Sequence, residues 1–501
     1  MRGSGILLPV FSLAGNYGIG GFSSEAYEFV DFLVKAGQRY WQVLPFGPTG
    51  AGNSPYQTFC SFAGNPLFIG VDGLVENGLL KKNEVKRFEY ESIPSRVDYG
   101  KIIAHRRRLF RKAYERFDTK SEAFRKFVSE QEEWLSDYCL FMSLKNVHEG
   151  VWFGAWEKKY VVRETDALQT FMNNHKEELY YYAFLQFIFE EQWQKLKQYA
   201  NNRGISIIGD IPIYVSMDST DVWTKPELFS LTEEMEAKLV AGCPPDGFSR
   251  KGQLWGNPVY LWENHKAQHF SWWIARIRRC FEWYDVLRID HFRGFDEFYT
   301  IPAGNETAEY GQWMKGPGME LFYAIRDELG DIRVIAEDLG QITDGVKQLV
   351  ADSGFPGMRI LEFAFYPSDG MNEGANGTSN YLPFNYEKNC VVYTGTHDNE
   401  TLMGWLGGLG KRLRKKVLNY LWLPEQIPDE VIAGELIRNA EASVADYCII
   451  PMQDFLKLDN RARINVPGTD GDNWTWRMEP KAATNILAKS IRKMMTTYGR
   501  I

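Results

Sequence analysis

Short apolar runs recur along the chain, and each one stops at a turn signal such as Pro, Gly or a charged residue. Runs of this length, bounded in this way, are typical of buried parallel strands. The sequence contains eight of them, at Gly5–Pro9, Tyr40–Pro45, Ile205–Ile211, Val286–Asp290, Val334–Glu337, Met358–Phe363, Cys390–Thr394 and Tyr447–Pro451.

Between most of these runs the spacing of apolar residues predicts amphipathic helices, for example Glu25–Ala36 and Tyr180–Ala200. Eight alternating strand–helix units predict an α/β fold, a closed (β/α)8 or TIM barrel. An open, doubly wound sheet is the alternative. No G-x-G-x-x-G turn follows the first run, which favours the barrel.

The runs are unevenly spaced, which predicts large insertions after the second and third strands. Residues 71–200 are charged and helix-patterned, so we expect a mainly helical insertion there. Residues 212–285 are rich in Trp, Pro and Gly and predict a loop-rich insertion that covers the active site. The tail after Pro451 is too short for a C-terminal β-sandwich, so residues 1–501 are expected to form a single catalytic barrel domain.

Three of the runs lead to a carboxylate and then to a turn. Asp290 and Glu337 each end a run, and Asp398 follows shortly after Cys390–Thr394. In a (β/α)8 barrel the C-terminal ends of the strands carry the catalytic groups. A single aspartate after a strand is as often a helix N-cap or a turn residue, but three acids in order predict an active site.

A retaining glycosidic transfer needs one carboxylate that attacks the anomeric carbon and one carboxyl group that protonates the leaving oxygen, about 5–5.5 Å apart. Asp290 and Glu337 end neighbouring predicted strands, which lie about 4.8 Å apart, so this geometry is reachable. Arg288 lies two residues before Asp290 and faces the same side, where its charge would keep Asp290 ionised. A salt bridge that closes a layer of the barrel interior is the alternative for Arg288.

The neighbours of these acids have predicted roles of their own. Asp398 is suited to hold sugar hydroxyls and to stabilise oxocarbenium charge, and His397 is suited to donate a hydrogen bond to a hydroxyl. His291 fits such a role and a purely structural one equally well. Alternation along the strand turns Asp338 to the other side, so we leave it out of the catalytic pair.

The same acids would also suit Mg²⁺ or Mn²⁺. However, the chain lacks the H-x-x-E-H and D-x-D spacings at these positions, and Arg288 would repel a cation near Asp290. We therefore expect no metal and no cofactor.

Composition and charge narrow the class of partner. A net charge of −8 and a pI near 5.6 imply no basic face for nucleic acid. The run His105–Arg108 lies in a helical pattern and predicts a solvated helix face. No stretch suits a signal peptide or a membrane span, and the six cysteines form no C-x-x-C pair, which predicts a cytoplasmic protein with reduced thiols. An aromatic content of 15% suits a carbohydrate binder, although core packing explains it equally.

Longer motifs run through nearly the whole chain. They are Gly15–Gly20, Trp41–Pro45, Asn53–Tyr56, Gly209–Tyr214, Pro244–Asp246, Trp255–Pro258 and Arg288–Gly294. Together they resemble the 4-α-glucanotransferases of glycoside hydrolase family 77, also known as amylomaltases or disproportionating enzymes. The Arg-Ile-Asp-His segment alone is less specific, because relatives of α-amylase carry similar strands.

The resemblance implies that Asp290 is the nucleophile, Glu337 the acid/base and Asp398 the transition-state stabiliser. It further implies a donor glucose site lined by Tyr56, Asp210, Arg288 and His397. On the acceptor side it implies a stacking platform at Trp255, a covering loop that holds Asp246 and Phe248, and further polar contacts at Ser54 and Asn257. Roles in turns or in loop packing are the alternatives for Tyr56, Asp210, Trp255, Ser54 and Asn257.

Two positions depart from the family pattern. Gly247 stands where the family loop often has a larger residue, and Phe384 stands where many relatives have His. The departure at Gly247 concerns loop stiffness and acceptor preference, and neither position touches the three acids.

The implied function is transfer of α-1,4-glucan segments from a donor maltooligosaccharide to the 4-hydroxyl of a glucose or glucan acceptor, by a retaining double displacement. Expected partners are maltooligosaccharides, starch- or glycogen-derived α-1,4-glucans and acceptor glucose, without nucleic acid or membrane. An α-1,4-glucan hydrolase and a non-catalytic glucan-binding protein are the alternatives. The Pro244–Pro258 loop favours transfer over hydrolysis, and the three acids argue against a protein that only binds.

Overall fold

The computed structural model describes residues 2–86, 95–245, 249–340, 342–366, 379–469 and 471–501. Eight parallel strands close into a barrel in the order β1-β12-β11-β10-β9-β6-β3-β2. Each strand overlaps one of the predicted apolar runs, so the predicted (β/α)8 barrel is confirmed. The strands are β1 (Gly3–Leu7), β2 (Tyr40–Gln42), β3 (Ser206–Ile211), β6 (Val286–Ile289), β9 (Val334–Ala336), β10 (Gly357–Ile360), β11 (Cys390–Tyr393) and β12 (Tyr447–Pro451).

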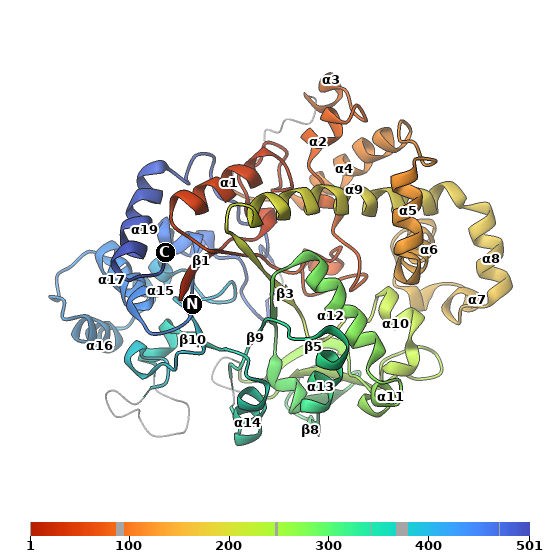
Figure 1. Cartoon of the computed structure of the whole chain (residues 1–501). Helices are drawn as coiled ribbons and strands as arrows, with labels where there is room; N and C mark the ends of the chain where they lie inside the picture. The colour runs from red at the N-terminus through yellow and green to blue at the C-terminus, as the bar shows by residue number, and fades with distance from the viewer. Residues whose placement is uncertain (1, 87–94, 246–248, 341, 367–378, 470) are drawn as a thin grey trace.

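Helices surround the barrel and cover the outer face of its sheet (Figure 1), while side chains of the strands themselves fill the interior, so both faces are buried. This is why the strands are continuous apolar runs rather than alternating ones. The longer helices outside the first insertion are α1 (Ser24–Lys35), α12 (Ser271–Trp283), α13 (Met319–Leu329), α14 (Asp344–Ser353), α16 (Lys411–Leu421), α17 (Asp429–Ala442) and α19 (Asn485–Thr497). Shorter ones are α10 (Thr220–Thr224), α11 (Trp262–Ala267), α15 (Leu402–Gly408) and α18 (Met452–Phe455).

The chain between β2 and β3 is helical, and Figure 1 shows much of it on the side of the barrel away from α16 and α17. The helices of this insertion are α2 (Val71–Glu76), α3 (Lys82–Lys86), α4 (Tyr99–Tyr114), α5 (Glu122–Glu130), α6 (Glu132–Val147), α7 (Lys158–Val161), α8 (Thr165–Asn174) and α9 (Lys176–Asn201). The longest of them, α9, corresponds to the helix predicted at Tyr180–Ala200.

A second sheet of four antiparallel strands lies outside the barrel, in the order β5-β4-β7-β8. The prediction of a loop-rich segment over 212–285 missed its first two strands. β4 begins with three adjacent apolar residues, and Leu254 and Trp255 stand side by side in β5, so neither strand has a clear period of two in its sequence. The strands are β4 (Leu239–Cys243), β5 (Gln253–Pro258), β7 (Glu297–Pro302) and β8 (Gln312–Lys315).

Close packing explains the glycine beside the site on β3. A Cβ atom on Gly209 would lie 2.1 Å from ring atoms of Tyr284, so no larger residue fits without displacing that ring. The next residue, Asp210, pairs in register with Arg288 on β6. The small residue thus lets Tyr284 pack against the strand while the strand delivers Asp210 to the barrel edge.

The basic run on α4 is less exposed than the sequence suggested. Arg106 is buried, and its guanidinium donates a hydrogen bond to the carbonyl of Ile69 at 3.2 Å. Burial raises the pKa of the nearby Glu25 carboxyl to about 7 and lowers the pKa of Arg106 to about 10. The prediction of a fully solvated face was therefore wrong at this one arginine, because charge alone does not reveal a buried partner.

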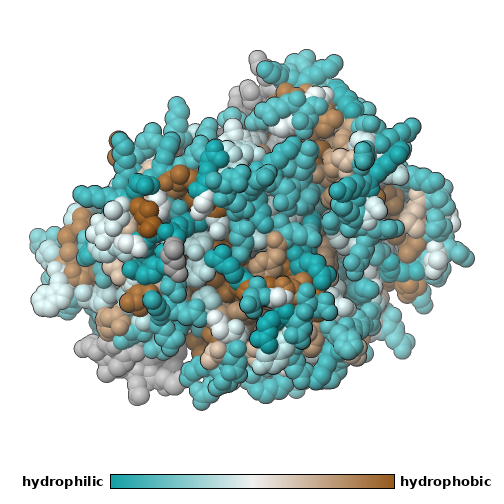
Figure 2. Space-filling view, in the orientation of Figure 1, coloured by the Kyte–Doolittle hydropathy of each residue, from teal (hydrophilic) through white to brown (hydrophobic). Residues whose placement is uncertain are grey.

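The visible surface is mostly hydrophilic, with apolar side chains in small separate groups (Figure 2). Within the described ranges, every helix is too short or too polar to cross a lipid bilayer.

Candidate active site

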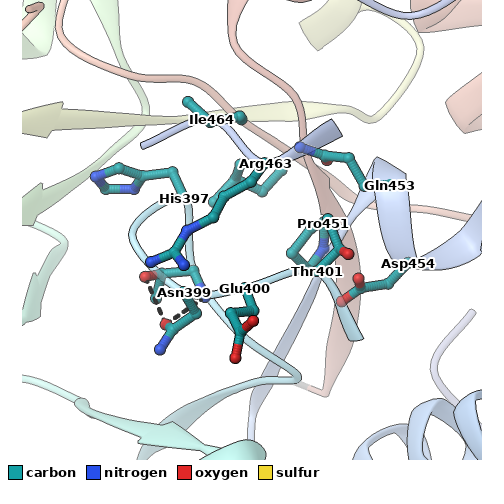
Figure 3. A pocket seen from close by; sticks show the side chains of 11 residues that line it. His397, Asn399, Glu400, Thr401, Pro451, Gln453, Asp454, Arg463 and Ile464 are labelled. Atoms are coloured by element: carbon teal, nitrogen blue, oxygen red, sulfur yellow. Dashed lines mark hydrogen bonds between the residues drawn. The ribbon is translucent and has the colours of Figure 1, made fainter. Parts of the chain in front are cut away.

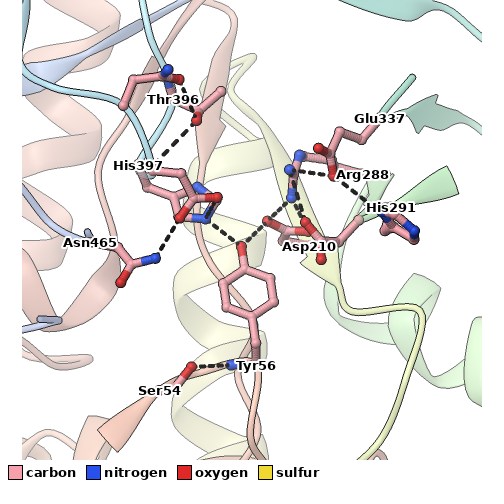
Figure 4. Close-up of polar contacts among 12 residues, drawn as sticks. Ser54, Tyr56, Asp210, Arg288, His291, Glu337, Thr396, His397 and Asn465 are labelled. Carbon is pink, nitrogen blue, oxygen red and sulfur yellow. Dashed lines mark hydrogen bonds and ion pairs between the residues drawn. The ribbon is translucent and has the colours of Figure 1, made fainter. Parts of the chain in front are cut away.

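Asp210 and Arg288 form a buried ion pair at the C-terminal edge of the barrel (Figure 4). They sit in register on the paired strands β3 and β6, and Nη1 of Arg288 lies 2.9 Å from Oδ1 and 2.7 Å from Oδ2 of Asp210. Their side chains are only 0% and 2% exposed, so this pair is closed to solvent. It fixes the guanidinium at the barrel edge.

The other end of the same guanidinium meets two further acids. Nη2 of Arg288 lies 3.1 Å from Oδ1 of Asp290 and 3.1 Å from Oε2 of Glu337. The two carboxylate oxygens are therefore separated by at most twice that distance. The Asp290 and Glu337 side chains are 27% and 18% exposed, unlike Asp210, so a ligand in the cleft can reach them.

The electrostatic environment of Glu337 favours its neutral form, and that of Arg288 favours its charged form. Burial, followed by the charge of Asp290, raises the pKa of the Glu337 carboxyl well above its ordinary range, and a hydrogen bond with Asp290 acts in the same direction. For Arg288, burial disfavours the charge, but Asp210, Glu337 and Asp290 outweigh it and raise its pKa. A neutral Glu337 beside a permanently charged arginine is the arrangement that a general acid requires.

Asp398 faces this group from the loop that follows β11. Its Oδ2 lies 3.3 Å from Nε2 of His397, and its Oδ1 accepts a hydrogen bond from Nδ2 of Asn465 at 2.6 Å. The backbone N–H of Asn465 also donates to the His397 carbonyl at 3.1 Å, and Arg463 donates to the Asp398 carbonyl at 2.6 Å. Asp398 remains 38% exposed toward the cleft.

Tyr56 links the two sides of the site (Figure 4). Its hydroxyl donates to Oδ2 of Asp210 at 2.7 Å and lies 2.9 Å from Nε2 of His397, whose ring is nearly parallel to the Tyr56 ring. Burial and the charge of Asp210 raise the pKa of this phenol well above its ordinary value. Ser54 fixes the backbone of the tyrosine, because its Oγ accepts a hydrogen bond from the Tyr56 N–H at 3.2 Å.

His291 serves the site through its backbone. It adopts a left-handed conformation with φ of 51°, and its N–H donates to Oε2 of Glu337 at 2.7 Å. Burial lowers the pKa of its ring to about 4, so the imidazole is neutral. The ring meets Trp255 edge to face, with centroids 4.8 Å apart, and Trp255 is half-buried on β5.

Three of the expected residues have other partners or fall outside the described chain. The Asn257 side chain donates to the Val215 carbonyl at 2.7 Å and accepts from Gln57 at 3.3 Å, so its amide supports neighbouring loops. Asp246 and Phe248, together with Gly247, lie outside the described residues. Phe384 is exposed, with its ring 6.4 Å from that of Tyr420.

Asp338 points away from the two acids of the cleft, as alternation along the strand predicts. Its Oδ1 accepts the Met358 N–H at 2.6 Å, and its Oδ2 pairs with Arg359 at 3.2 Å. It therefore joins β9 to β10. Across the described residues, the acids, histidines and cysteines form no group of three or more suited to hold a metal ion.

Sequence reasoning missed Arg463 and Asn465, which come from the segment after β12. They lie far from Asp398 along the chain, and neither has a motif that links it to the acids. They reach the site because β12 pairs with β11, whose following loop carries Asp398.

A parallel barrel with carboxylates and an arginine at its C-terminal edge defines the class of enzymes that cleave and re-form glycosidic bonds. Residues 8–484 match the family model described as 4-alpha-glucanotransferase, glycoside hydrolase family 77, and the chain belongs to this family. Its activity is that of a 4-alpha-glucanotransferase on α-1,4-glucans, so the family and the function predicted from sequence are confirmed.

Individual relatives agree over the full length. The chain is 46% identical over 496 residues to a 4-alpha-glucanotransferase from Clostridium butyricum, covering 98% of this chain and 100% of that protein. It superimposes on the amylomaltase from Streptococcus agalactiae in complex with acarbose with a TM-score of 0.95, at 40% identity and 100% coverage of both chains. The amylomaltase from Corynebacterium glutamicum, at 18% identity and a TM-score of 0.78, shares the fold over 100% of this chain and 74% of its own.

Proposed function

We propose that the transfer proceeds by a double displacement with Asp290 as the nucleophile and Glu337 as the acid/base. In the first step an Asp290 oxygen bonds to the anomeric carbon of the donor as the glycosidic C–O bond breaks. The leaving oxygen takes the proton of the Glu337 carboxyl group, and the reducing-end fragment departs. The products are a glycosyl ester on Asp290 and a Glu337 carboxylate.

The second step reverses the roles. The Glu337 carboxylate removes the proton of an acceptor 4-hydroxyl, the resulting oxygen bonds to the anomeric carbon, and the ester bond to Asp290 breaks. Glu337 is again protonated and Asp290 is again a carboxylate. Because each step inverts the anomeric centre, the transferred bond keeps its α configuration.

We propose that the remaining polar residues bind the donor glucose. Asp398 and His397 hold ring hydroxyls, and Asp398 stabilises the positive charge of the oxocarbenium-like transition state. Tyr56 lines the opposite side of the donor site, and the buried Asp210 holds its hydroxyl, with Arg288 as the shared anchor. Donors are maltooligosaccharides and longer α-1,4-glucans, and acceptors include free glucose. Ser54 and Asn257 support this site through their neighbours.

One observation carries these assignments. A single guanidinium nitrogen of Arg288 contacts both Asp290 and Glu337 at 3.1 Å, while the pKa of Glu337 is raised by its burial. A carboxyl group with a raised pKa, held by the same guanidinium as a second carboxyl group, is what the first step needs.

Incubation with maltotriose tests the proposed reaction. Transfer yields a ladder of longer oligosaccharides without a net gain of reducing ends, because every bond broken is replaced by a bond formed. A gain of reducing ends without longer products would instead identify a hydrolase. Unchanged maltotriose, with binding seen by calorimetry, would identify a protein that only binds glucan.

Trp255→Ala is expected to shift the fate of the glycosyl ester from transfer to hydrolysis. If the ring stacks on the acceptor sugar, its loss removes about 1–3 kcal/mol from acceptor binding, whereas water needs no platform. The ratio of new reducing ends to elongated products from maltotriose should then rise roughly tenfold.

Trp422→Ala is the matched control for this variant, because that tryptophan is 94% exposed at the end of α16. It should leave the ratio unchanged. If Trp255→Ala lowers both products together and keeps their ratio, Trp255 packs against His291 without serving the acceptor.

Chelation is expected to leave activity unchanged. The proposed chemistry uses carboxyl groups alone, and the charge of Arg288 already occupies the space among Asp210, Asp290 and Glu337. Activity on maltotriose is measured before and after EDTA treatment and dialysis. A loss that added Mg²⁺, Mn²⁺ or Ca²⁺ restores would overturn the assignment.

A further inference from the structure

The loop that carries His397 and Asp398 runs from Thr394 to Leu402, and we call it the catalytic loop. Both of its ends meet the same buried side chain, Asp454. The Thr394 hydroxyl donates to Oδ2 of Asp454 at 2.5 Å, and the Leu402 backbone N–H donates to Oδ1 at 2.8 Å. One carboxylate therefore closes the loop at its base.

Asp454 is well placed for this role because it is fixed to the barrel. It lies in α18, directly after the last barrel strand β12, and its residue is only 1% exposed. The adjacent Gln453 donates to the Ala462 carbonyl at 3.2 Å, which anchors the same turn on its other side. A buried carboxylate is costly to keep unless its oxygens are hydrogen-bonded, and here both oxygens bind the catalytic loop.

Ring packing holds one side of the catalytic loop, where the His397 ring centroid lies 5.4 Å from that of Tyr56 and 6.0 Å from that of Trp474. A small pocket lies behind the loop, lined by Thr396, His397, Glu400 and Thr401 from the loop and by Asp454 and Arg463 from the segment after β12 (Figure 3). The side chains around this pocket are mainly polar, so hydrogen bonds contribute to the position of the loop on that side.

Other contacts hold the tip of the loop and its C-terminal end, where Asn460 accepts the Thr401 N–H at 3.2 Å and donates to Glu400 at 2.6 Å. Asn399 accepts hydrogen bonds from the N–H and the hydroxyl of Thr396 at 2.8 and 2.9 Å, which shapes the turn locally. Arg463 and Asn465 hold Asp398 itself. Within the described chain, Asp454 is the side chain that binds both ends of the loop, so it controls how the whole tip sits against Asp290 and Glu337.

We propose that Asp454 is a positioning residue that sets the placement of Asp398 and His397 in the transition state by clamping both ends of the catalytic loop. This inference rests on the proposed function of Asp398. A clamp that acts on transition-state geometry lowers kcat when it is lost, while donor binding, which also uses Tyr56, changes little.

Three variants and one control test the clamp. Asp454→Leu removes both acceptors, Asp454→Asn keeps one carbonyl acceptor, and Thr394→Val removes one donor with little change of shape. The control is Asp459→Asn, five residues further on, where an exposed aspartate binds only the nearby Arg461 in the contacts described. Circular dichroism and thermal unfolding establish that each variant is folded.

The expected result is a graded loss of kcat on maltotriose. Asp454→Asn and Thr394→Val should lower kcat roughly 10-fold, and Asp454→Leu roughly 100-fold, with KM within about threefold of wild type, on the scale of a misplaced catalytic group. Asp459→Asn should be unchanged. If Asp454→Leu does not fold, the kcat values of Asp454→Asn and Thr394→Val test the proposal instead. A kcat within twofold of wild type for both, or a loss confined to KM, overturns the proposal.

A double-mutant cycle separates this proposal from the proposed function. With a maltosyl fluoride donor, Asp454→Asn is measured alone and together with Asp398→Asn. If Asp454 acts through Asp398, its substitution costs at least several-fold less in the double variant than alone. Full additivity rejects the clamp but leaves Asp398 catalytic. If Asp398→Asn alone keeps full activity, the proposed role of Asp398 fails, and the positioning role fails with it.

Discussion

Asp290→Asn should reduce transfer from maltotriose to less than about a hundredth of the wild-type rate while leaving glucan binding largely intact. The carboxamide cannot attack the anomeric carbon, so the covalent step is lost. The pocket keeps its shape because Arg288 remains bound to Asp210 through Nη1. Direct oligosaccharide analysis measures the rate, and calorimetry with a maltooligosaccharide measures the binding.

Asp296→Asn provides the matched control for this variant. Asp296 follows the turn after Asp290 and lies 3.8 Å from Lys315, on the side of the second sheet. Its substitution should change transfer by less than about threefold, as is usual away from reacting groups. If Asp290→Asn keeps more than about a hundredth of wild-type activity, Asp290 is not the nucleophile.

Glu337→Gln should be nearly as damaging with natural donors and much less so with a donor that has a good leaving group. A fluoride leaving group departs without a proton, so the first step no longer needs the Glu337 acid. Rates with maltotriose and with maltosyl fluoride are compared under single-turnover conditions, which isolate formation of the glycosyl ester. Equal loss with both donors would count against the acid/base role.

The same assignment predicts the direction of the pH dependence. Burial, then the charge of Asp290, raises the pKa of Glu337, so its acid form persists to a higher pH than that of an ordinary glutamate. Because the first step consumes the acid form, kcat/KM with maltotriose should fall as the pH rises through this raised pKa. The alkaline fall should be absent with maltosyl fluoride, and its presence with both donors would assign it to another group.

The barrel was predictable from sequence because each of its strands is buried on both faces. Burial on both faces produces a continuous apolar run, and the turn after it carries the acid, so Val286–Asp290 and Val334–Glu337 identified both a strand and a site residue. The contact of Arg288 with Asp290 followed from the same alternation.

Features that depend on distant segments were not predictable. The exposed strand β8 has no alternation to reveal it, and Arg106 has the same charge whether it is buried or solvated. Asn465 and Asp454 reach the catalytic loop only because β12 closes the barrel beside β11. No local pattern encodes a contact that the closure of the whole sheet creates.

That closure also has a consequence for how the chain folds during its synthesis. Strand β1 pairs with β12, with Gly3 opposite Tyr447 and Leu7 opposite Pro451. The first strand to be synthesised therefore lacks this pairing partner until the last strand has been made. Until then β1 and β11 each present an unpaired edge, the kind of edge that templates association with other chains. The contacts of Asp454 with the catalytic loop form at the same late stage. An incomplete chain therefore has neither a closed barrel nor the hydrogen bonds that fix the catalytic loop. We expect nascent molecules to become active only when all eight strands have paired.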